Sequence, residues 1–505
     1  MKRDGVRKSI WQDEIKEFPV CNNIDTIYDV AIIGGGITGV STAYRLQKSG
    51  KNCILLEAFN IGFGTTGGTT AHLNNFYDTT YAEAINKFGL KDAMLLAEST
   101  KDAVSIIENN INENHIECDF ETKSAHLFAL DDQQKKKLEE MMEGSEKVGH
   151  VMIPIEEISY PIPFTKAVEI PGQGQFHPIK YSCALNHVFL NSGGTIIENC
   201  RCESHSEEEG IIILTTSKGI IKARRVVYAT HIPPGISRLH FTNSPYRSYV
   251  IAFTLKNNNY PEELGYDLLD AYHYYRVQKI NGEKLLIAGG EDHKTGHSDD
   301  TSACFSKLEN YVREYFEVDL VKYSWSSQYF EPVDGVPYIG KLPGFENIYT
   351  ATGFRGNGMM FGSLSSKIIS DLILTGNSEY EKLFNPSRVD PIAGFTEFIK
   401  ENFSVVTDFI KDKLFVEKIT SLAEINNGEG KVVKYEDESY AIFKENNGKV
   451  HLLKSTCPHA KCEVRWNNAE LSWDCPCHGS RFGVNGEVLT APSVKGLMKI
   501  NEKSL

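Results

Sequence analysis

Two short cysteine and histidine pairs near the C-terminal end constrain the fold and chemistry of this chain more than any other feature. The first is CPH (457–459), and after residues 460–474 it is followed by CPCH (475–478). A C-x-H pair and a C-x-x-H pair on two turns supply two thiolates and two imidazoles, a ligand set that suits a [2Fe–2S] cluster. Zinc also accepts C-x-x-H pairs, but the C-x-H spacing argues against it. The predicted ligands are Cys457, His459, Cys475 and His478.

The segment around these pairs resembles the Rieske family, in the form whose two ligand loops are joined by a disulfide. CPHAKC (457–462) and CPCHGSRFGVNGEVLTAP (475–492) carry the resemblance, which runs from LAEINNGEG (422–430) to the C-terminus. It implies a Rieske-type [2Fe–2S] cluster and a disulfide between Cys462 and Cys477, with two free thiols as the alternative. Histidine ligation raises the potential of such clusters to about −150 to +300 mV. We therefore expect a centre that accepts electrons readily.

The sequence departs from the usual Rieske pattern at two places. Ala460 and Lys461 stand where Leu-Gly is usual in the first loop, and APS (491–493) stands where Gly-Pro-Ala is usual. Neither departure touches a predicted ligand, so both concern the potential or the docking surface of the cluster.

A second constraint is the glycine cluster near the N-terminus. GGGITG (34–39) follows the apolar run YDVAII (28–33) and begins a helical pattern over 37–49, so G-x-G-x-x-G lies in a strand–turn–helix context. Glycines there allow a tight turn and close approach of the backbone to a pyrophosphate. The next predicted strand, NCILLE (52–57), ends at Glu57, whose carboxylate can accept hydrogen bonds from ribose hydroxyls. A glycine-rich turn in an unrelated α/β domain is the alternative.

Three further segments resemble the FAD-dependent amino-acid oxidase superfamily, which includes enzymes that oxidise glycine, sarcosine and dimethylglycine. They are GTTGGTTAHLN (64–74), EPVDGVPYIG (331–340) and ATGFRGNGMMFG (351–362), and the resemblance covers roughly residues 28–376. It implies FAD rather than NAD, with the N-terminus of a helix near Gly356 directed at the flavin. The FAD-binding residues predicted from these motifs are Gly34, Gly36, Gly39, Glu57, Thr65, Thr66, Thr69, His72, Asp334, Gly353, Arg355, Gly356, Asn357, Gly358 and Met359.

His72 has two possible roles. In some amine dehydrogenases of this superfamily a histidine after such a threonine-rich turn bonds covalently to the flavin, and TTAH (69–72) places His72 comparably. We favour a histidine that hydrogen-bonds near the flavin without a covalent bond.

Catalytic residues are unknown from the sequence, because the superfamily removes a hydride from the carbon beside an amine nitrogen without a strong protein base. Candidates for the substrate pocket are Arg276, Arg355, Tyr249 and Tyr274, with Arg247 less favoured. Relatives such as glycine oxidase carry an arginine shortly before an Asp-Gly pair. This chain has QYFEPV (328–333) before Asp334, which disfavours simple amino acids. Tyrosines of the 246–275 region could line a pocket for an amine cation, although packing is the alternative.

The whole chain also resembles a group of bacterial proteins that join this flavin fold to a Rieske domain. We predict an α/β FAD-binding domain of the Rossmann-like, glutathione-reductase type, an inserted mixed-sheet substrate domain, and a small all-β Rieske domain. The predicted boundaries are an N-terminal extension at 1–27, the FAD-dependent oxidoreductase at 28–385 with its substrate subdomain at roughly 150–325, a linker and amphipathic helix at 386–414, and the Rieske domain at 415–505.

The charge and composition of the chain limit the kinds of binding partner that we expect. The net charge of −14 disfavours nonspecific binding to nucleic acid or anionic lipid. No apolar run is long enough for a membrane span and no signal peptide is recognisable, so we predict a cytoplasmic protein. The expected partners are a small amine or amino-acid-like substrate and an external electron acceptor, either a protein or a quinone.

Together these features predict an FAD-dependent dehydrogenase acting on CH–NH or CH–NH2 groups, with the cluster as outlet for its electrons. A redox sensor, or an electron carrier without its own amine substrate, is the alternative. The sequence leaves open the direction of electron flow and the distance between the two cofactors.

Overall fold

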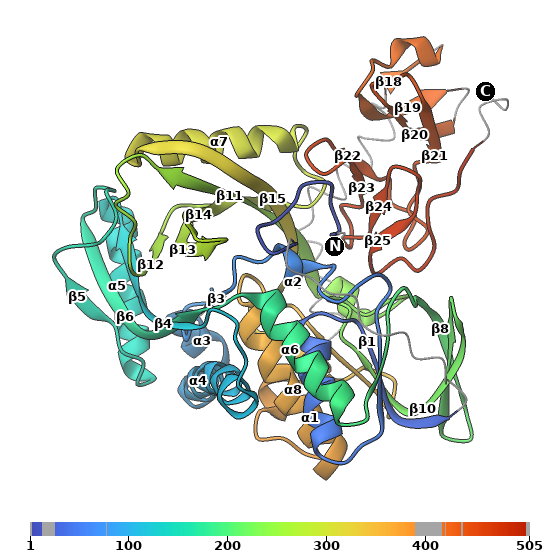
Figure 1. Cartoon of the computed structure of the whole chain (residues 1–505), viewed down its shortest axis with the longest axis horizontal. Coiled ribbons are helices and arrows are strands. Elements are labelled where there is room, and N and C mark those ends of the chain that lie inside the picture. The colour runs from blue at the N-terminus through green and yellow to red at the C-terminus, as the bar shows by residue number, and fades with distance from the viewer. Residues whose placement is uncertain are drawn as a thin grey trace.

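The computed structural model describes residues 3–12, 26–76, 78–388, 417–419, 421–435 and 438–500. The amphipathic helix predicted within 395–414 lies outside these residues. Two large sheets and two small ones form the body of the protein. The two small sheets belong to the C-terminal domain, which lies beside the two large sheets at the upper right of Figure 1. None of the described helices combines the length and apolarity that a bilayer crossing requires.

The first large sheet has the order β16-β17-β10-β1-β2-β7, and β9 and β8 extend it from β10. Its central strand β1 pairs in parallel with β2 and β10. Helices α1, α6 and α8 pack together beside it, low in Figure 1. Strands that are covered by helices have continuous apolar sequences, which explains the apolar sequence of β1. The strands are β1 (Ile27–Ile33), β2 (Cys53–Leu56), β7 (Thr195–Ile197), β8 (Cys202–Glu208), β9 (Ile211–Thr216), β10 (Gly219–Tyr228), β16 (Tyr338–Lys341) and β17 (Ile348–Thr352).

The second large sheet has the order β15-β11-β14-β13-β12-β4-β6-β3, with β5 paired to β6. Its strands are β3 (His72–Leu73), β4 (Glu121–Ala129), β5 (Ile153–Ile155), β6 (Lys166–Gln175), β11 (Asn243–Leu255), β12 (Leu264–Asp267), β13 (Tyr274–Ile280), β14 (Glu283–Lys294) and β15 (Val318–Pro332). This sheet differs from the predicted subdomain at 150–325 in two ways. Its first strands, β3 and β4, precede residue 150, and residues 195–228 belong to the first sheet instead. Both sheets contain antiparallel strands of alternating pattern, so the pattern does not tell which sheet a strand joins.

The helices of these two layers range from single turns to long helices, and α8 is buried on almost all sides. They are α1 (Ile37–Lys48), α2 (Thr65–Gly68), α3 (Tyr81–Phe88), α4 (Leu90–Asn114), α5 (Asp132–Lys147), α6 (Pro178–Asn191), α7 (Thr301–Tyr315), α8 (Gly358–Thr375), α9 (Glu381–Phe384) and the 3-10 turn η2 (Arg238–Phe241). Thr80 begins α3 with a capping box to Glu83, and Asp300 begins α7 by accepting backbone hydrogen bonds.

The C-terminal domain consists of two four-stranded sheets, which confirms the predicted small all-β domain. The first contains β18 (Glu417–Lys418), β19 (Gly430–Tyr435), β20 (Glu438–Lys444) and β21 (Val450–Lys454), preceded by the 3-10 turn η3 (Leu422–Glu424). The second contains β22 (Arg465–Asn467), β23 (Ser472–Asp474), β24 (Arg481–Gly483) and β25 (Val488–Thr490). Trp473 and Phe482 are fully buried in its core, next to Cys457 and Cys475.

A buried group of charges joins the N-terminal segment, the second large sheet and the C-terminal domain. We call it the interdomain charge cluster, and it comprises Arg3, Asp4, Arg247, Glu470, Asp474 and Arg481. Arg3 pairs with Glu470 at 3.0 Å and donates a hydrogen bond to the carbonyl of Ser326 at 2.8 Å. Arg481 pairs with Asp4 at 2.9 Å and with Asp474 at 3.0 Å. The described N-terminal residues therefore bind both domains at once.

Opposite charges compensate the burial of these groups. Burial by itself opposes ionisation of Glu470, but Arg3, Arg247 and Arg481 lower the pKa of this carboxyl below its ordinary value. Removing one residue of such a buried network leaves the charge of its partner buried and uncompensated.

We expect Arg3→Met to lower the free energy of unfolding by about 3–5 kcal/mol, because Glu470 would remain buried without its ion-pair partner. Thermal unfolding of the full chain measures this change. The control is Arg224→Met, which removes an exposed arginine that lies 3.9 Å from Asp29. Equal melting temperatures for the two variants would show that the interdomain charge cluster does not stabilise the assembly.

Candidate active site and metal centre

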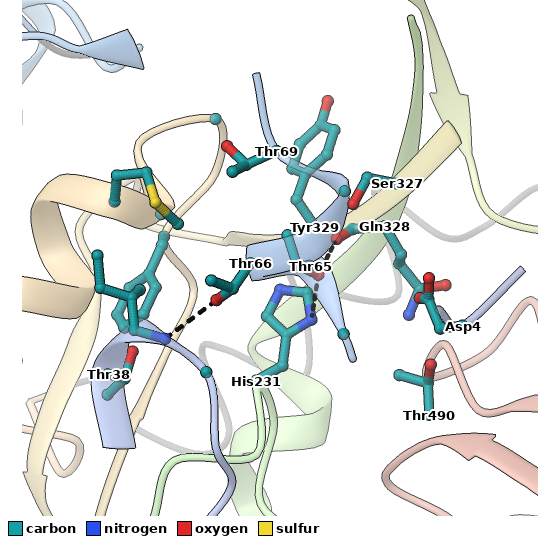
Figure 2. Close-up of a pocket in the computed structure, with 18 of the residues that line it drawn as sticks. Asp4, Thr38, Thr65, Thr66, Thr69, His231, Ser327, Gln328, Tyr329 and Thr490 are labelled. Atoms are coloured by element: carbon teal, nitrogen blue, oxygen red, sulfur yellow. Dashed lines mark hydrogen bonds between the residues drawn. The ribbon is translucent and has the colours of Figure 1, made fainter. Parts of the chain in front are cut away.

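A long cavity lies between the first sheet, the second sheet and the C-terminal domain, and we call it the flavin cavity. Its walls include the β1–α1 turn, α2, the start of α8 and the facing strands β11, β14 and β15. Residues 489–491 of the C-terminal domain also line it. Figure 2 shows Asp4, Gln328 and Thr490 together on one side of this cavity. Three parts of the chain that are distant in sequence therefore contribute to one site.

The β1–α1 turn is as tight as the glycine motif predicts. Gly34 has a φ of +112°, and a Cβ on Gly39 would lie 1.9 Å from the Gly34 carbonyl oxygen. The N-terminus of the 12-residue helix α1 borders the cavity, and the backbone amide of Ile37 donates a hydrogen bond to Thr66 Oγ1 at 3.0 Å. A helix N-terminus behind a glycine turn stabilises phosphate charge, so the turn fits the pyrophosphate of FAD.

Glu57 lies at the cavity wall at the end of β2. Its carboxylate accepts hydrogen bonds from the backbone amides of Gly35 at 2.7 Å and Phe59 at 2.9 Å. Burial raises the pKa of Glu57, although these two bonds act in the opposite direction. The two amides orient the carboxylate, and each oxygen retains a lone pair for a ribose hydroxyl. The position fits the predicted role.

The threonine-rich segment around α2 forms a neighbouring wall. Thr65 Oγ1 donates a hydrogen bond to the Gln328 carbonyl at 2.9 Å and lies 3.3 Å from Nδ1 of His231 (Figure 2). Thr66 and Thr69 line the cavity beside it. His231 also lines it, and no sequence motif marks this residue.

His72 lines the cavity with both ring nitrogens engaged. Nδ1 lies 2.9 Å from the Thr70 hydroxyl and Nε2 lies 3.2 Å from the Tyr275 carbonyl. Burial, with the neighbouring charge of Arg276, lowers the pKa of His72 to about 3, so the ring is neutral. A neutral ring donates from Nε2 to the carbonyl and accepts at Nδ1. The hydrogen-bonded role of His72 toward the flavin stays a prediction.

The start of α8 borders the cavity as the superfamily resemblance implies. Gly356, Asn357, Gly358 and Met359 line it, and no side chain of the described residues caps the helix there. Arg355 is held at a φ of +50° and lies 3.3 Å from Glu331. The partial positive charge at a helix N-terminus stabilises negative charge in front of it.

Three of the predicted FAD-binding residues lie behind the cavity wall. Gly39 packs against Gly34, as described above. Asp334 binds the Arg388 guanidinium at 2.8 and 2.9 Å, and a Cβ on Gly353 would lie 2.7 Å from Asn243 Oδ1. Asp334 thus supports the wall through an ion pair, and Gly353 supports it through packing. The motifs predicted both as FAD contacts because motif spacing does not distinguish residues of the wall from residues of the layer behind it.

The substrate-pocket candidates separate into two groups. Tyr274 and Arg355 line the cavity, whereas Arg276 and Tyr249 do not. Arg276 Nη1 donates to the carbonyls of Thr70 at 2.7 Å and Ala71 at 3.0 Å, so it holds the threonine-rich segment in place. The hydroxyl of Tyr249 lies 2.9 Å from His293 Nε2 in a separate core. We therefore correct the assignment of Arg276 and Tyr249 as substrate ligands.

Several cavity residues have no counterpart among the predicted ones. They are Asp4, Asp78, His231, Tyr266, Asp292, Tyr329 and Thr490. Asp292 offers one usable signal, since it follows the buried run LLIAGG at the end of β14. The others lie in segments without a motif.

The predicted metal ligands lie on two adjacent loops of the C-terminal domain. Cys457, Cys475 and His478 are buried, and the ring centroids of His459 and His478 are 5.0 Å apart. Nδ1 of His459 is buried and has no hydrogen-bond partner among the described residues. Two buried thiols and two facing imidazoles, one with an unsatisfied nitrogen, fit the ligand set of a [2Fe–2S] cluster.

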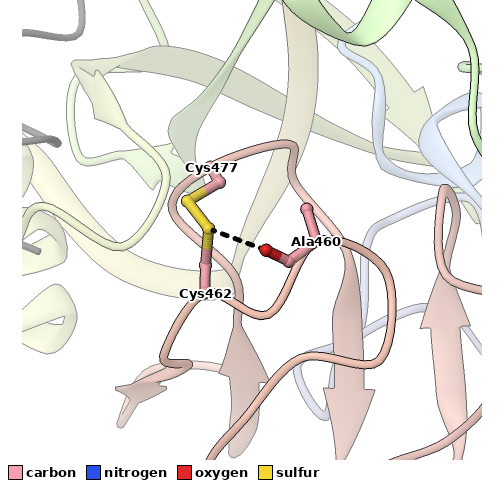
Figure 3. Close-up of a disulfide and its surroundings, with 3 residues drawn as sticks. All are labelled: Ala460, Cys462 and Cys477. Atoms are coloured by element: carbon pink, nitrogen blue, oxygen red, sulfur yellow. Dashed lines mark hydrogen bonds between the residues drawn. A yellow bond between two sulfur atoms is a disulfide. The ribbon is translucent and has the colours of Figure 1, made fainter.

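A disulfide joins the two ligand loops. Figure 3 shows the disulfide between Cys462 and Cys477, whose S–S distance is 1.97 Å, and this pairing agrees with the one implied by the resemblance. The sulfur of Cys475 lies within 4.8 Å of both disulfide sulfurs. The bridge therefore fixes the loops directly beside a predicted ligand.

The cluster loops pack directly against the flavin-binding part of the chain. The His240 ring centroid lies 4.7 Å from that of His459 and 5.8 Å from that of His478. Gln328, a cavity residue, donates a hydrogen bond from Nε2 to the Gly479 carbonyl at 2.9 Å. Gly479 directly follows His478. One side chain thus connects the wall of the flavin cavity to a cluster loop.

Comparison with known families agrees with this division of the chain. The family described as FAD dependent oxidoreductase (DAO) matches residues 29–372, and the Rieske [2Fe-2S] domain family matches residues 416–501.

Individual proteins of known sequence or structure are similar to the chain as well. YhfW of Bacillus subtilis (strain 168), named as a Rieske 2Fe-2S iron-sulfur protein, is 34% identical over 493 residues, which cover 97% of this chain and 96% of YhfW. The gamma-glutamylputrescine oxidoreductase of Escherichia coli (strain K12) is 26% identical over 70% of this chain and 84% of its own length. The crystal structure of glycine oxidase from Geobacillus kaustophilus superposes with a TM-score of 0.58 at 18% identity, covering 72% of this chain and 99% of that one.

Proposed function

Because the chain belongs to the FAD dependent oxidoreductase (DAO) family and carries a C-terminal Rieske [2Fe–2S] domain, we propose that it is a dehydrogenase that oxidises an amine at the FAD site and passes the electrons to its own cluster. FAD and a Rieske-type [2Fe–2S] cluster are its cofactors. An external acceptor, a protein or a quinone, then takes the electrons from the cluster. The family supports oxidoreductase chemistry, and the CH–NH specificity is part of the proposal.

FAD, when bound, supplies hydride acceptance together with the ability to release electrons one at a time, which a [2Fe–2S] cluster requires. The residues of the chain have separate tasks. The β1–α1 turn and Glu57 bind the dinucleotide, and the N-terminus of α8 stabilises negative charge beside it. Tyr274 lines the same cavity next to His72, with ring centroids 5.7 Å apart.

The observation that carries the proposal is the contact between Gln328 and Gly479. Gln328 borders the flavin cavity, and its bond to the Gly479 carbonyl lies one residue from the ligand His478. Electron transfer within one chain requires that the two sites adjoin, and this contact supports that arrangement. The amine in the name of the Escherichia coli relative supports the substrate class.

Anaerobic mixing of the full protein, loaded with FAD and iron, with separate amines and amino acids tests this function. We expect at least one amine to bleach the visible absorption of the flavin in the absence of oxygen. If no amine or amino acid bleaches it, while a one-electron reductant reduces the cluster and then the flavin, the protein is a carrier without its own substrate.

A further inference from the structure

One end of the flavin cavity is both aromatic and acidic. Tyr272, Tyr274 and Tyr329 line it together with two carboxylates, Asp78 and Asp292. The ring centroids of Tyr272 and Tyr274 are 5.8 Å apart. Tyrosine rings and carboxylates both attract cations, so this end is suited to a positively charged group.

The two carboxylates differ in their partners. Asp78 accepts a hydrogen bond from the backbone amide of Gly356 at 2.8 Å, and the charge of Arg355 lies close to it. Asp292 accepts a hydrogen bond at Oδ2 from the Tyr329 hydroxyl at 2.8 Å. Its Oδ1 is buried, and the Ser248 side chain lies close enough to act on the same carboxylate. No ion pair is formed by Asp292 among the described residues.

The basic groups near this end are already compensated. Arg355 lies 3.3 Å from Glu331 and donates to the Thr79 hydroxyl at 2.8 Å. Lys294 lies over the ring of Tyr246 at 5.9 Å. A substrate carboxylate would have to displace Glu331 to bind Arg355. The Asp292 carboxylate, in contrast, has no cationic partner within the part of the chain that the structure describes.

We propose that Asp292 binds an ammonium group of the substrate, with the neighbouring tyrosines around it. This inference rests on the proposed function and deepens it, because it defines the substrate class. The substrate then carries two nitrogen groups. One is the neutral amine that is oxidised, and the other stays protonated at Asp292. No carboxylate is required on the reacting carbon.

Burial around Asp292 is consistent with this role. It raises the pKa of Asp292 to about 7, because water does not stabilise the carboxylate there. A bound ammonium group would replace that missing stabilisation through a charge-assisted hydrogen bond.

Titrations of the FAD-loaded full chain test the proposal through the shift of the flavin spectrum on binding, read before the flavin bleaches. The probes are 1,4-diaminobutane, n-butylamine and glycine, and the readout is the change in the flavin absorption spectrum under anaerobic conditions. We expect the diamine to bind at least about tenfold more tightly than n-butylamine, and glycine to bind most weakly, because a charge-assisted hydrogen bond accounts for that difference.

Variants locate the binding group. Asp292→Asn should remove the preference for the diamine, whereas Asp299→Asn, which removes the same charge at an exposed site, should keep it. An Asp292→Asn protein that still prefers the diamine would overturn the proposal. If the variant does not fold, a wild-type protein that binds glycine more tightly than the diamine overturns it instead. Diamine binding without bleaching of the flavin would contradict the proposed function and leave this inference standing.

Discussion

Replacing Cys457 with serine should remove the cluster while leaving FAD bound. The Cys457 sulfur is fully buried beside Cys475, and a serine hydroxyl is a poor ligand for iron. We expect iron to fall from two atoms per chain to almost none. The flavin cavity is formed mainly by other segments, so the flavin content should stay unchanged. Iron analysis and the visible spectrum measure both quantities.

The matched control for that experiment is Cys118→Ser. Cys118 is also buried, but it packs in the core near α4 and far from the ligand loops in the sequence. Its replacement should leave the iron content at the wild-type value. A Cys457→Ser protein with full iron content would show that the metal ligands have been assigned wrongly.

Replacing Gly39 with alanine should weaken FAD binding by about tenfold to a hundredfold. The new Cβ would lie 1.9 Å from the Gly34 carbonyl oxygen, which is backbone and has to move. Overpacking of this kind costs about 1–3 kcal/mol, and here the shift displaces the turn that binds the pyrophosphate. Fluorescence titration of the apoprotein with FAD measures the affinity.

Gly50→Ala serves as the control for the glycine turn. Gly50 also has a positive φ, +84°, but a Cβ there would meet no atom of the described residues within 4 Å. It should cost about 1 kcal/mol of stability and leave the affinity for FAD unchanged. Equal FAD affinities for the Gly39 and Gly50 variants would contradict the assigned role of the turn.

The local motifs were predictable because each follows from short-range geometry. The glycine turn before α1, the carboxylate of Glu57 and the threonines of α2 all line the flavin cavity or shape its wall, as their spacing indicates. The Cys462–Cys477 disulfide also agrees with its implied pairing. In these segments a few residues with special backbone requirements determine the structure.

Orientation across the sheets was not predictable in the same way. Arg276 and Tyr274 lie two residues apart on β13, yet only Tyr274 reaches the cavity, because Arg276 is bound by carbonyls of the threonine-rich segment. Asp292 enters the cavity from β14, where the buried run LLIAGG before it is a weak signal that does not tell which way its side chain points. Long-range packing decides which side chain of a strand faces a cavity, and sequence spacing does not contain that information.

The docking of the C-terminal domain is the least predictable feature. It depends on contacts between residues that are 151 to 467 positions apart, such as Gln328 with Gly479 and Arg3 with Glu470. Buried ion pairs of this kind have no sequence signature, because each partner alone reads as an ordinary surface charge. The proximity of the two cofactor sites therefore emerges only from the fold.

The central claim is that electrons taken from an amine at the FAD site reach the cluster of the same chain. Anaerobic rapid mixing with a substrate amine, followed by freezing and electron paramagnetic resonance, tests it most directly. The account predicts that the signal of the reduced cluster grows as the flavin bleaches, at a rate independent of protein concentration. A flavin that bleaches while the cluster signal never forms, or forms at a rate proportional to protein concentration, would contradict it.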